Sequence, residues 1–252
     1  MYDNLGEYNK AKEIHEKALT IYEKIFGEDH ADVARSYNNL ALVYDNLGEY
    51  NQAKELHEKA LTIYEKIFGE DHADVATSYN NLALVYDNLG EYNKANELHE
   101  KALTIYKKIF GEDHADVATS YNNLAAVYDS LGEYNQAKEL HEKALTIRKK
   151  MFGGDHADVA TSYNNLALVY QQLGDHADVA INYNNLVSVY SCLGQYNQAK
   201  ELYEKALTIR KQIFGEDHKY VERILSELAL VDKHLVSSGA EDRHEKACCL
   251  IL

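Results

Sequence analysis

Histidine and aspartate recur together along this chain, a combination that suggests a metal site. Asp-His-Ala-Asp, or a variant of it, places a histidine at six similar positions: His30, His72, His114, His156, His176 and His218. A zinc ion needs ligand atoms about 2.0–2.3 Å away, whereas equivalent atoms of successive copies are separated by two helix layers of about 8–10 Å each. One loop alone offers a His and two Asp. We therefore expect these loops to cap helices, and we expect no metal and no other cofactor.

A second histidine pattern resembles half of a metalloprotease site. His-Glu occurs at His57, His99 and His141 and begins the sequence H-E-x-x-H, in which a second histidine completes a pair of zinc ligands. Leu61 stands at that place in the first copy, and leucine also occupies it in the others. The sequence also contains no phosphate-binding Gly-rich loop, nucleophile elbow or Cys/His pair. We therefore expect no catalytic residues and no enzymatic activity.

The last four residues offer a different chemistry. Cys249-Leu250-Ile251-Leu252 matches the prenylation signal C-a-a-X, and a final leucine favours geranylgeranyl. Cys248 offers a place for a second lipid. Only Arg243 and Lys246 add positive charge nearby, so a single prenyl group would tether the chain weakly to a membrane. The alternative is a frayed apolar tail without modification.

Composition excludes several classes of function. The 252 residues include 26 Lys or Arg and 41 Asp or Glu, a net charge of −15, which argues against a nucleic-acid partner. No apolar run approaches the length of a membrane span, and three cysteines fit a reducing compartment. Proline is absent where about 5% is usual, which favours an all-helical chain. We expect a cytoplasmic protein, membrane-associated if Cys249 carries a lipid.

A repeat of 42 residues positions the recurring histidines and aspartates. The string Tyr-Asn-Asn-Leu-Ala begins at four tyrosines that are 42 residues apart: Tyr37, Tyr79, Tyr121 and Tyr163. In 29–70, apolar residues step by four and three along a helix A from about Ala31 to Leu47, and a helix B follows from about Tyr50 to Phe68. Glycines are expected to end the A helices: Gly6, Gly48, Gly90, Gly132, Gly174 and Gly194. Each repeat is therefore predicted to be a pair of helices.

The motif of this repeat resembles a known family. Tyr37-x-x-Leu40-Ala41-x-x-Tyr44, followed by Gly48-x-Tyr50-x-x-Ala53 and Ala60-Leu61, is similar to the tetratricopeptide repeat (TPR). The 42-residue length resembles the long variant of kinesin light chains and nephrocystin-like arrays. The resemblance covers about 1–235 and implies an all-α fold, a right-handed TPR superhelix (α-solenoid) of antiparallel helix pairs.

The repeat divides the chain into complete and incomplete pairs. In chain order we expect 1–28 (partial repeat), 29–70, 71–112 and 113–154 (complete repeats), 155–174 (orphan helix A), 175–216 (complete repeat), 217–235 (capping helix) and 236–252 (flexible tail). Met1 falls inside a helix A, so that either a poor cap or a fragment of a longer protein is expected there.

The pattern also breaks at Gly174. Tyr163 and Tyr183 are only 20 residues apart, so 22 residues, a whole helix B, are missing. The helix A at 177–193 must then occupy the place of a B helix, and Asn184 and Asn185 would leave the surface lined by the earlier Asn pairs. An error in the gene sequence is the alternative explanation.

The resemblance implies that A helices line a concave groove that holds a ligand. The expected groove residues are Asn38, Asn39, Leu42, Asp45, Asn80, Asn81, Leu84, Asp87, Asn122, Asn123, Asp129, Asn164 and Asn165. An amide both donates and accepts, so an asparagine ladder pairs with an extended peptide of any sequence. The alternative is an asparagine that bonds a neighbouring A helix, and we expect at least one asparagine of each pair to face the groove.

These observations favour a non-catalytic scaffold that binds other proteins or peptides along the groove. Because the groove positions carry Asn, Leu and Asp, a neutral or basic, partly apolar peptide fits better than an acidic one. The alternatives are a kinesin-light-chain-like cargo adaptor, a regulatory array from a larger protein such as an NTPase, and an adaptor tethered to a membrane through Cys249.

Overall fold

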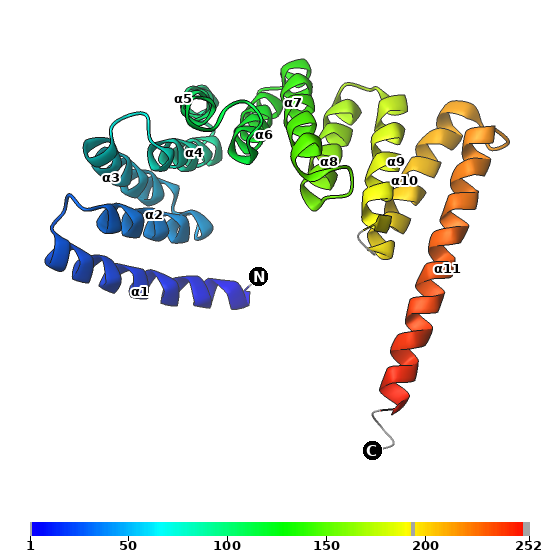
Figure 1. The fold of residues 1–252 in the computed structure, drawn as a ribbon, viewed down its shortest axis with the longest axis horizontal. Helices are drawn as coiled ribbons and strands as arrows, with labels where there is room; N and C mark the ends of the chain where they lie inside the picture. Colours follow the sequence, from blue (N-terminus) through cyan, green and yellow to red (C-terminus); the bar gives the residue numbers. More distant parts are fainter. Residues whose placement is uncertain (1, 193–194, 249–252) are drawn as a thin grey trace. The chain divides into compact units, whose positions relative to one another are not determined.

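Every element that the structure describes is an α-helix (Figure 1). The structure is a computed structural model, and it describes the backbone of 2–192 and 195–248 and the side chains of 7–187, 190–192, 195–213 and 215–235. The helices of this described part are α1 (Tyr2–Phe26), α2 (Ala31–Asn46), α3 (Tyr50–Phe68), α4 (Ala73–Asn88), α5 (Tyr92–Phe110), α6 (Ala115–Ser130), α7 (Tyr134–Phe152), α8 (Ala157–Gln172), α9 (His176–Cys192), α10 (Tyr196–Phe214) and α11 (Lys219–Cys248). From α2 to α8 their lengths and spacing follow the 42-residue repeat.

Local signals set the bounds of these helices, and the predicted bounds of α2 and α3 are confirmed. His30 caps α2, because its Nδ1 accepts a hydrogen bond from the backbone N–H of Asp32 at 3.2 Å. Gly48 ends the turn after α2 with φ +76°, a left-handed conformation that glycine adopts without strain. The backbone N–H of Glu49 then donates to the carbonyl of Tyr44 at 2.9 Å and closes the helix end.

Small residues hold the helices close together. Ala41 of helix A and Ala53 and Ala60 of helix B have no exposed surface, so the backbones of α2 and α3 approach closely where they pack. Tyrosine joins two A helices of unit 1 to the preceding B helix, since the Tyr37 hydroxyl donates to Glu23 Oε1 at 2.6 Å and the Tyr79 hydroxyl to Glu65 Oε1 at 2.7 Å. Apolar burial and these polar links together make the stack continuous within each unit.

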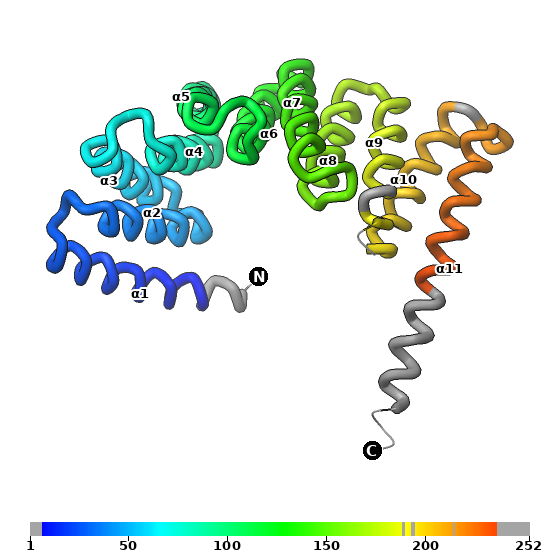
Figure 2. The backbone as a smooth tube through the Cα atoms, in the orientation of Figure 1, coloured from blue at the N-terminus to red at the C-terminus, as the bar shows by residue number. Residues whose placement is uncertain are grey.

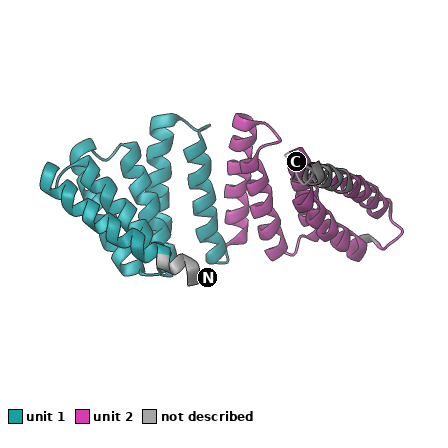
Figure 3. Ribbon diagram, turned by 90° about the horizontal axis from the view of Figure 1, so that it is seen from below, with its two compact units in different colours: residues 1–132 teal, residues 133–252 magenta. Residues whose placement is uncertain are grey.

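The chain forms two compact units (Figure 3). Unit 1 is Met1–Gly132, in which consecutive helices from α1 to α6 pack on one another, and unit 2 is Glu133–Leu252, with α7 to α11. In unit 1, side-chain hydrogen bonds link α2 to α4 and α4 to α6. The A helices of unit 1 therefore lie in one row.

Two expected helix ends differ in the structure. Gly6 was expected to end a helix, but α1 is one helix from Tyr2 to Phe26. Only a short piece of helix precedes Gly6, too little to be stable as a separate packed helix, so continuous helical hydrogen bonding prevails. The capping helix expected at 217–235 is the first part of α11, whose backbone continues through the expected flexible tail to Cys248.

The break at Gly174 produces a hairpin of two A-type helices (Figure 2). Gly174 has φ +74°, and the backbone N–H of Asp175 donates to the Tyr170 carbonyl at 2.9 Å, as at the regular turns. Helix α9 packs against both α8 and α10, just as the A helix α4 packs against both α3 and α5. The predicted change of phase therefore stays a prediction. The core here includes Tyr183 and Leu186 of α9.

Candidate functional site

The first asparagine of each pair in unit 1 holds helices together. Asn80 Oδ1 lies 2.8 Å from His99 Nδ1, and Asn80 Nδ2 donates to Ser120 Oγ at 3.3 Å. Asn38 makes the same two contacts, with His57 at 2.8 Å and Ser78 at 3.4 Å. Asn38 and Asn80 were expected in the groove, and the structure corrects this, because a B-helix histidine and the next A helix use both ends of their amides.

Burial fixes the charge state of the histidines in these links. It lowers the pKa of His57 and of His99 to about 4, so both rings are neutral near neutral pH. Because Asn Oδ1 can only accept, the ring Nδ1 carries the hydrogen. Sequence reasoning assigned these histidines to an amphipathic helix and missed the link. The available signal was a polar residue at a place where the family has an aromatic one.

The second asparagine of each pair remains on an open face of unit 1. Asn39 is exposed, and Asn81 and Asn123 are half-buried. Beside them Leu42 and Leu84 have 44% and 43% of their surface exposed, which is a large apolar exposure for leucine in a packed helix. We call this surface the exposed stripe; its members are Asn39, Leu42, Asn81, Leu84, Asn123 and Ala126.

A row of aspartates borders the exposed stripe. Asn88 Nδ2 donates to Asp45 Oδ1 at 3.1 Å. One repeat later Ser130 stands in place of Asn88, and the corresponding Asp87 has a buried Oδ1 with no hydrogen-bond partner among the described residues. Asp129 has the same unpartnered Oδ1. Burial raises the pKa of the Asp45, Asp87 and Asp129 carboxyls. These oxygens favour a hydrogen-bond donor from outside the unit.

In unit 2 the same motif has different surroundings. Asn164 of α8 is exposed and Asn165 is half-buried, although Asn80 and Asn122 are buried at positions equivalent to Asn164. The residue 19 positions after Asn164 is Tyr183 of α9, where the regular repeats have a histidine. Because a helix B is missing here, Asn164 lacks the histidine that holds Asn80 inward in the regular repeat.

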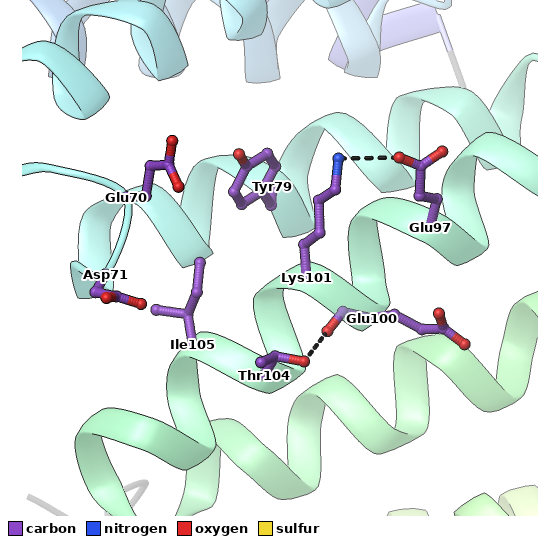
Figure 4. A pocket seen from close by; sticks show the side chains of 8 residues that line it. All are labelled: Glu70, Asp71, Tyr79, Glu97, Glu100, Lys101, Thr104 and Ile105. Carbon is purple, nitrogen blue, oxygen red and sulfur yellow. Dashed lines mark hydrogen bonds and ion pairs between the residues drawn. The ribbon is translucent and has the colours of Figure 1, made fainter.

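An acidic hollow, which the sequence analysis did not identify, opens beside α5 (Figure 4). Its volume is about 580 Å³, and its lining residues are Glu70, Asp71, Tyr79, Glu97, Glu100, Lys101, Thr104 and Ile105. Lys101 Nζ lies 2.9 Å from Glu97 Oε1, and Lys108 pairs with Asp71. A similar hollow lies one repeat earlier, between Glu28 and Ile63. Internal pairing satisfies much of this charge, so the hollow is a weaker candidate than the exposed stripe.

Other chemistry has less support in the described part of the chain. Among those residues no cluster of His, Cys, Asp or Glu has a geometry that would hold a metal ion. The described helices also include none long and apolar enough to span a bilayer. Cys248 and Cys249, the candidates for lipidation, lie outside the residues whose side chains the structure describes.

Successive helix pairs of fixed length define this chain as a helical-repeat protein. The tetratricopeptide-repeat model matches 1–66, 46–108, 75–150 and 130–179, and a second model of the same repeat matches 183–219. The chain therefore belongs to the tetratricopeptide-repeat family. No curated protein sequence matches it.

Several solved structures have a similar fold. BtubC (BKLC) from P. vanneervenii is 21% identical, with a TM-score of 0.69, over 92% of this chain and 90% of that one. A putative kinesin light chain with nearly identical TPR-like repeats from Podosopora anserina is 26% identical, with a TM-score of 0.60, over 84% and 92%. The apo form of RapI is 17% identical, with a TM-score of 0.66, over 96% and 93%. The first and last of these show the fold alone.

Proposed function

We propose that this protein is a non-catalytic scaffold and that the exposed stripe of unit 1 binds an extended segment of a partner protein. Tetratricopeptide repeats generally mediate protein–protein interactions. The observation that carries the proposal is the pair of exposed leucines, Leu42 and Leu84, which recur at one repeat spacing beside the exposed or half-buried amides of Asn39 and Asn81. Apolar contacts repeated at fixed spacing beside hydrogen-bonding groups suit a peptide that crosses successive helices.

The chemistry of the stripe selects the partner. Asn81 and Asn123 offer both donors and acceptors to a peptide backbone. Asp87 and Asp129 have raised pKa values because they are buried, and each has an oxygen that lacks a donor. A lysine, an arginine or a backbone N–H of the partner would supply that donor and relieve the cost of burial. A neutral or basic segment with apolar side chains therefore fits best.

A cargo-adaptor role is the second candidate. It is supported by the 26% identity with the putative kinesin light chain from Podosopora anserina. Such a role would use the same stripe, so the two candidates differ in the partner and agree on the surface.

The first experiment is to select peptides from a displayed random library on the full chain and to measure affinities by fluorescence anisotropy. We expect the selected peptides to carry apolar and basic residues. Leu84→Glu should weaken their binding about tenfold, equivalent to about 1.4 kcal/mol, because it removes the apolar contact at the centre of the stripe.

The matched control is Leu168→Glu on α8 of unit 2, which alters a leucine with 50% of its surface exposed, against 43% for Leu84. It should leave the affinity unchanged. If Leu84→Glu had no effect, or if both variants weakened binding equally, the stripe of unit 1 would not be the binding surface.

A further inference from the structure

A row of apolar side chains lies where the B helices of unit 1 end. Each of these helices finishes with Ile-Phe before its glycine. Ile67 and Phe68 have 40% of their surface exposed, Ile109 has 39% and Phe110 has 40%. Single exposed apolar residues are ordinary, whereas a row of pairs at a fixed spacing indicates an interaction surface. We call this surface the apolar edge; its members, all exposed, are Ile25, Phe26, Ile67, Phe68, Ile109 and Phe110.

Ion pairs bring the ends of successive B helices together. Lys66 of α3 pairs with Asp29, in the loop after α1, and Lys108 of α5 pairs with Asp71, in the loop after α3. Both lysines lie in the last turn of their helix, directly before the Ile-Phe pair. The members of the apolar edge on α1, α3 and α5 therefore follow one another along the same side of unit 1.

Stacking holds the phenylalanines of the apolar edge in place. The Phe68 ring centre lies 5.9 Å from that of Tyr64 and 4.2 Å from that of His72, and the equivalent distances at the end of α5 are 6.1 and 4.2 Å. Tyr64 is buried, and His72 caps α4. The stack explains the choice of phenylalanine, but Ile67 is not part of it. A side chain that is already held in place loses little conformational entropy when a partner covers it.

The acidic hollow beside α5 opens next to the apolar edge (Figure 4). Glu70 and Asp71 of its lining follow Phe68 two and three residues later, and the rest of the lining extends along α4 and α5 to Ile105. Four carboxylates and one lysine belong to this lining. Glu70 and Glu100 make no ion pair with a described residue. The excess of negative charge beside apolar side chains favours a basic partner.

We propose that the apolar edge of unit 1 binds a basic amphipathic helix of a partner protein, whose apolar face covers the Ile-Phe pairs of α3 and α5 and whose lysines or arginines lie at the acidic hollow. Equivalent residues of α3 and α5 are at most two helix layers apart, about 16–20 Å. Apolar residues about seven to eleven positions apart share one face of a helix and span about 10–16 Å. One straight helix therefore reaches both pairs.

A helix suits this edge better than an extended segment. The backbone N–H groups of Gly69 and Gly111 already donate to Glu65 and Lys107 at 2.9 and 3.0 Å. The edge thus offers side chains, and an extended segment would find few backbone partners there, whereas a helix satisfies its own backbone groups. The apolar edge shares no residue with the exposed stripe, so the failure of either proposal leaves the other unchanged.

The test is fluorescence anisotropy of the full chain with labelled, alanine-rich helical peptides of about 20 residues. The first peptide carries leucines along one face and lysines on both sides of that face. Two comparison peptides have glutamate in place of every lysine, or the same composition in scrambled order. We expect the lysine peptide to bind at least about tenfold more tightly than either comparison peptide. Salt at about 0.5 M should weaken its binding, because the charges at the hollow are exposed.

Variants locate the binding on the apolar edge. Ile67→Lys and Ile109→Lys should each weaken binding of the lysine peptide about tenfold or more, because they remove an apolar contact and add a like charge. The matched control is Ile213→Lys, which alters the equivalent isoleucine of α10 in unit 2, also 40% exposed, and should leave the affinity unchanged. Circular dichroism checks that all three variants keep the fold.

A charge reversal tests the role of the hollow. Glu70→Lys changes an exposed residue, so it should keep the fold, weaken the lysine peptide and strengthen the glutamate peptide. The proposal is overturned if the lysine peptide does not bind, or if a comparison peptide binds as tightly. It is equally overturned if Ile67→Lys has no effect or no more effect than Ile213→Lys, or if Glu70→Lys leaves both peptides unchanged.

Discussion

The first helices of the pairs α4–α5 and α9–α10 contain the same Tyr-Asn-Asn-Leu string, yet its first asparagine has different surroundings in the two. In unit 1, Asn80 is bonded to His99 and Ser120. In unit 2, Asn184 has neither partner. The role of the asparagine is therefore set by residues 19 and 40 positions later, and the motif alone does not determine it. A set of matched substitutions tests this comparison.

The largest expected effect is a loss of stability when Asn80 is replaced by leucine, compared with the same replacement at Asn184. Asn80→Leu should lower the free energy of unfolding by about 2–4 kcal/mol, because it leaves the His99 N–H and the Ser120 hydroxyl buried without a partner. Asn184→Leu should change it by less than about 0.5 kcal/mol, since no partner is lost. Urea unfolding followed by circular dichroism measures both values. Equal losses would show that the two asparagines have the same role.

Acid should weaken unit 1 through its buried histidines. The pKa of His99 is lowered to about 4 in the folded chain, so between about pH 6.5 and 4 the unfolded chain binds more protons than the folded one. The stability that neutral His99 contributes is therefore complete above about pH 6.5 and is lost as the pH falls towards 4, up to about 3 kcal/mol. His99→Tyr, which introduces the residue of the last repeat, should make the unfolding free energy less dependent on pH across this range. An unchanged dependence would contradict the neutral, buried state of His99.

A smaller change, a gain in stability, should follow when Tyr203 of unit 2 is replaced by the histidine that the regular repeats have at this position. Tyr203→His offers Asn184 Oδ1 the donor it lacks and should raise the unfolding free energy by about 1 kcal/mol at neutral pH. Thermal unfolding measures the change. An unchanged stability would mean that the histidine does not bond Asn184.

The smallest effect on stability is expected at the exposed leucines. Leu84→Glu and Leu168→Glu should each change the unfolding free energy by less than about 0.5 kcal/mol, since both side chains are largely exposed. Only Leu84→Glu should weaken the binding of the selected peptides. A large loss of stability in either variant would show that the leucine packs in the core.

The parts of the fold that depend on local signals were predictable from the sequence. Helix ends at His30 and Gly48 follow from capping within a few residues, and the direct succession of α8 and α9 at Gly174 follows from a missing length of chain. The end expected at Gly6 was wrong, because a glycine stops a helix here only where a second helix is long enough to pack back on the first. The residues around a glycine do not show whether such a second helix is present.

The candidate site was predictable only in part. Leu42 and Leu84 are exposed, and their place in a binding groove stays a prediction. Asn38 and Asn80 bond other helices instead, and these partners lie 19 and 40 residues further along the chain.

The near-identity of the repeats has a consequence for how the chain folds. The Tyr79–Glu65 contact of α4 on α3 is repeated as Tyr37–Glu23 of α2 on α1, so an A helix of one repeat fits the B helix of another almost as well as its own neighbour. Skipping a repeat adds only a modest loop-closure cost, about 0.6 kcal/mol for each doubling of the loop. Refolding should therefore pass through slipped pairings and, at high concentration, through exchanged helices between two chains.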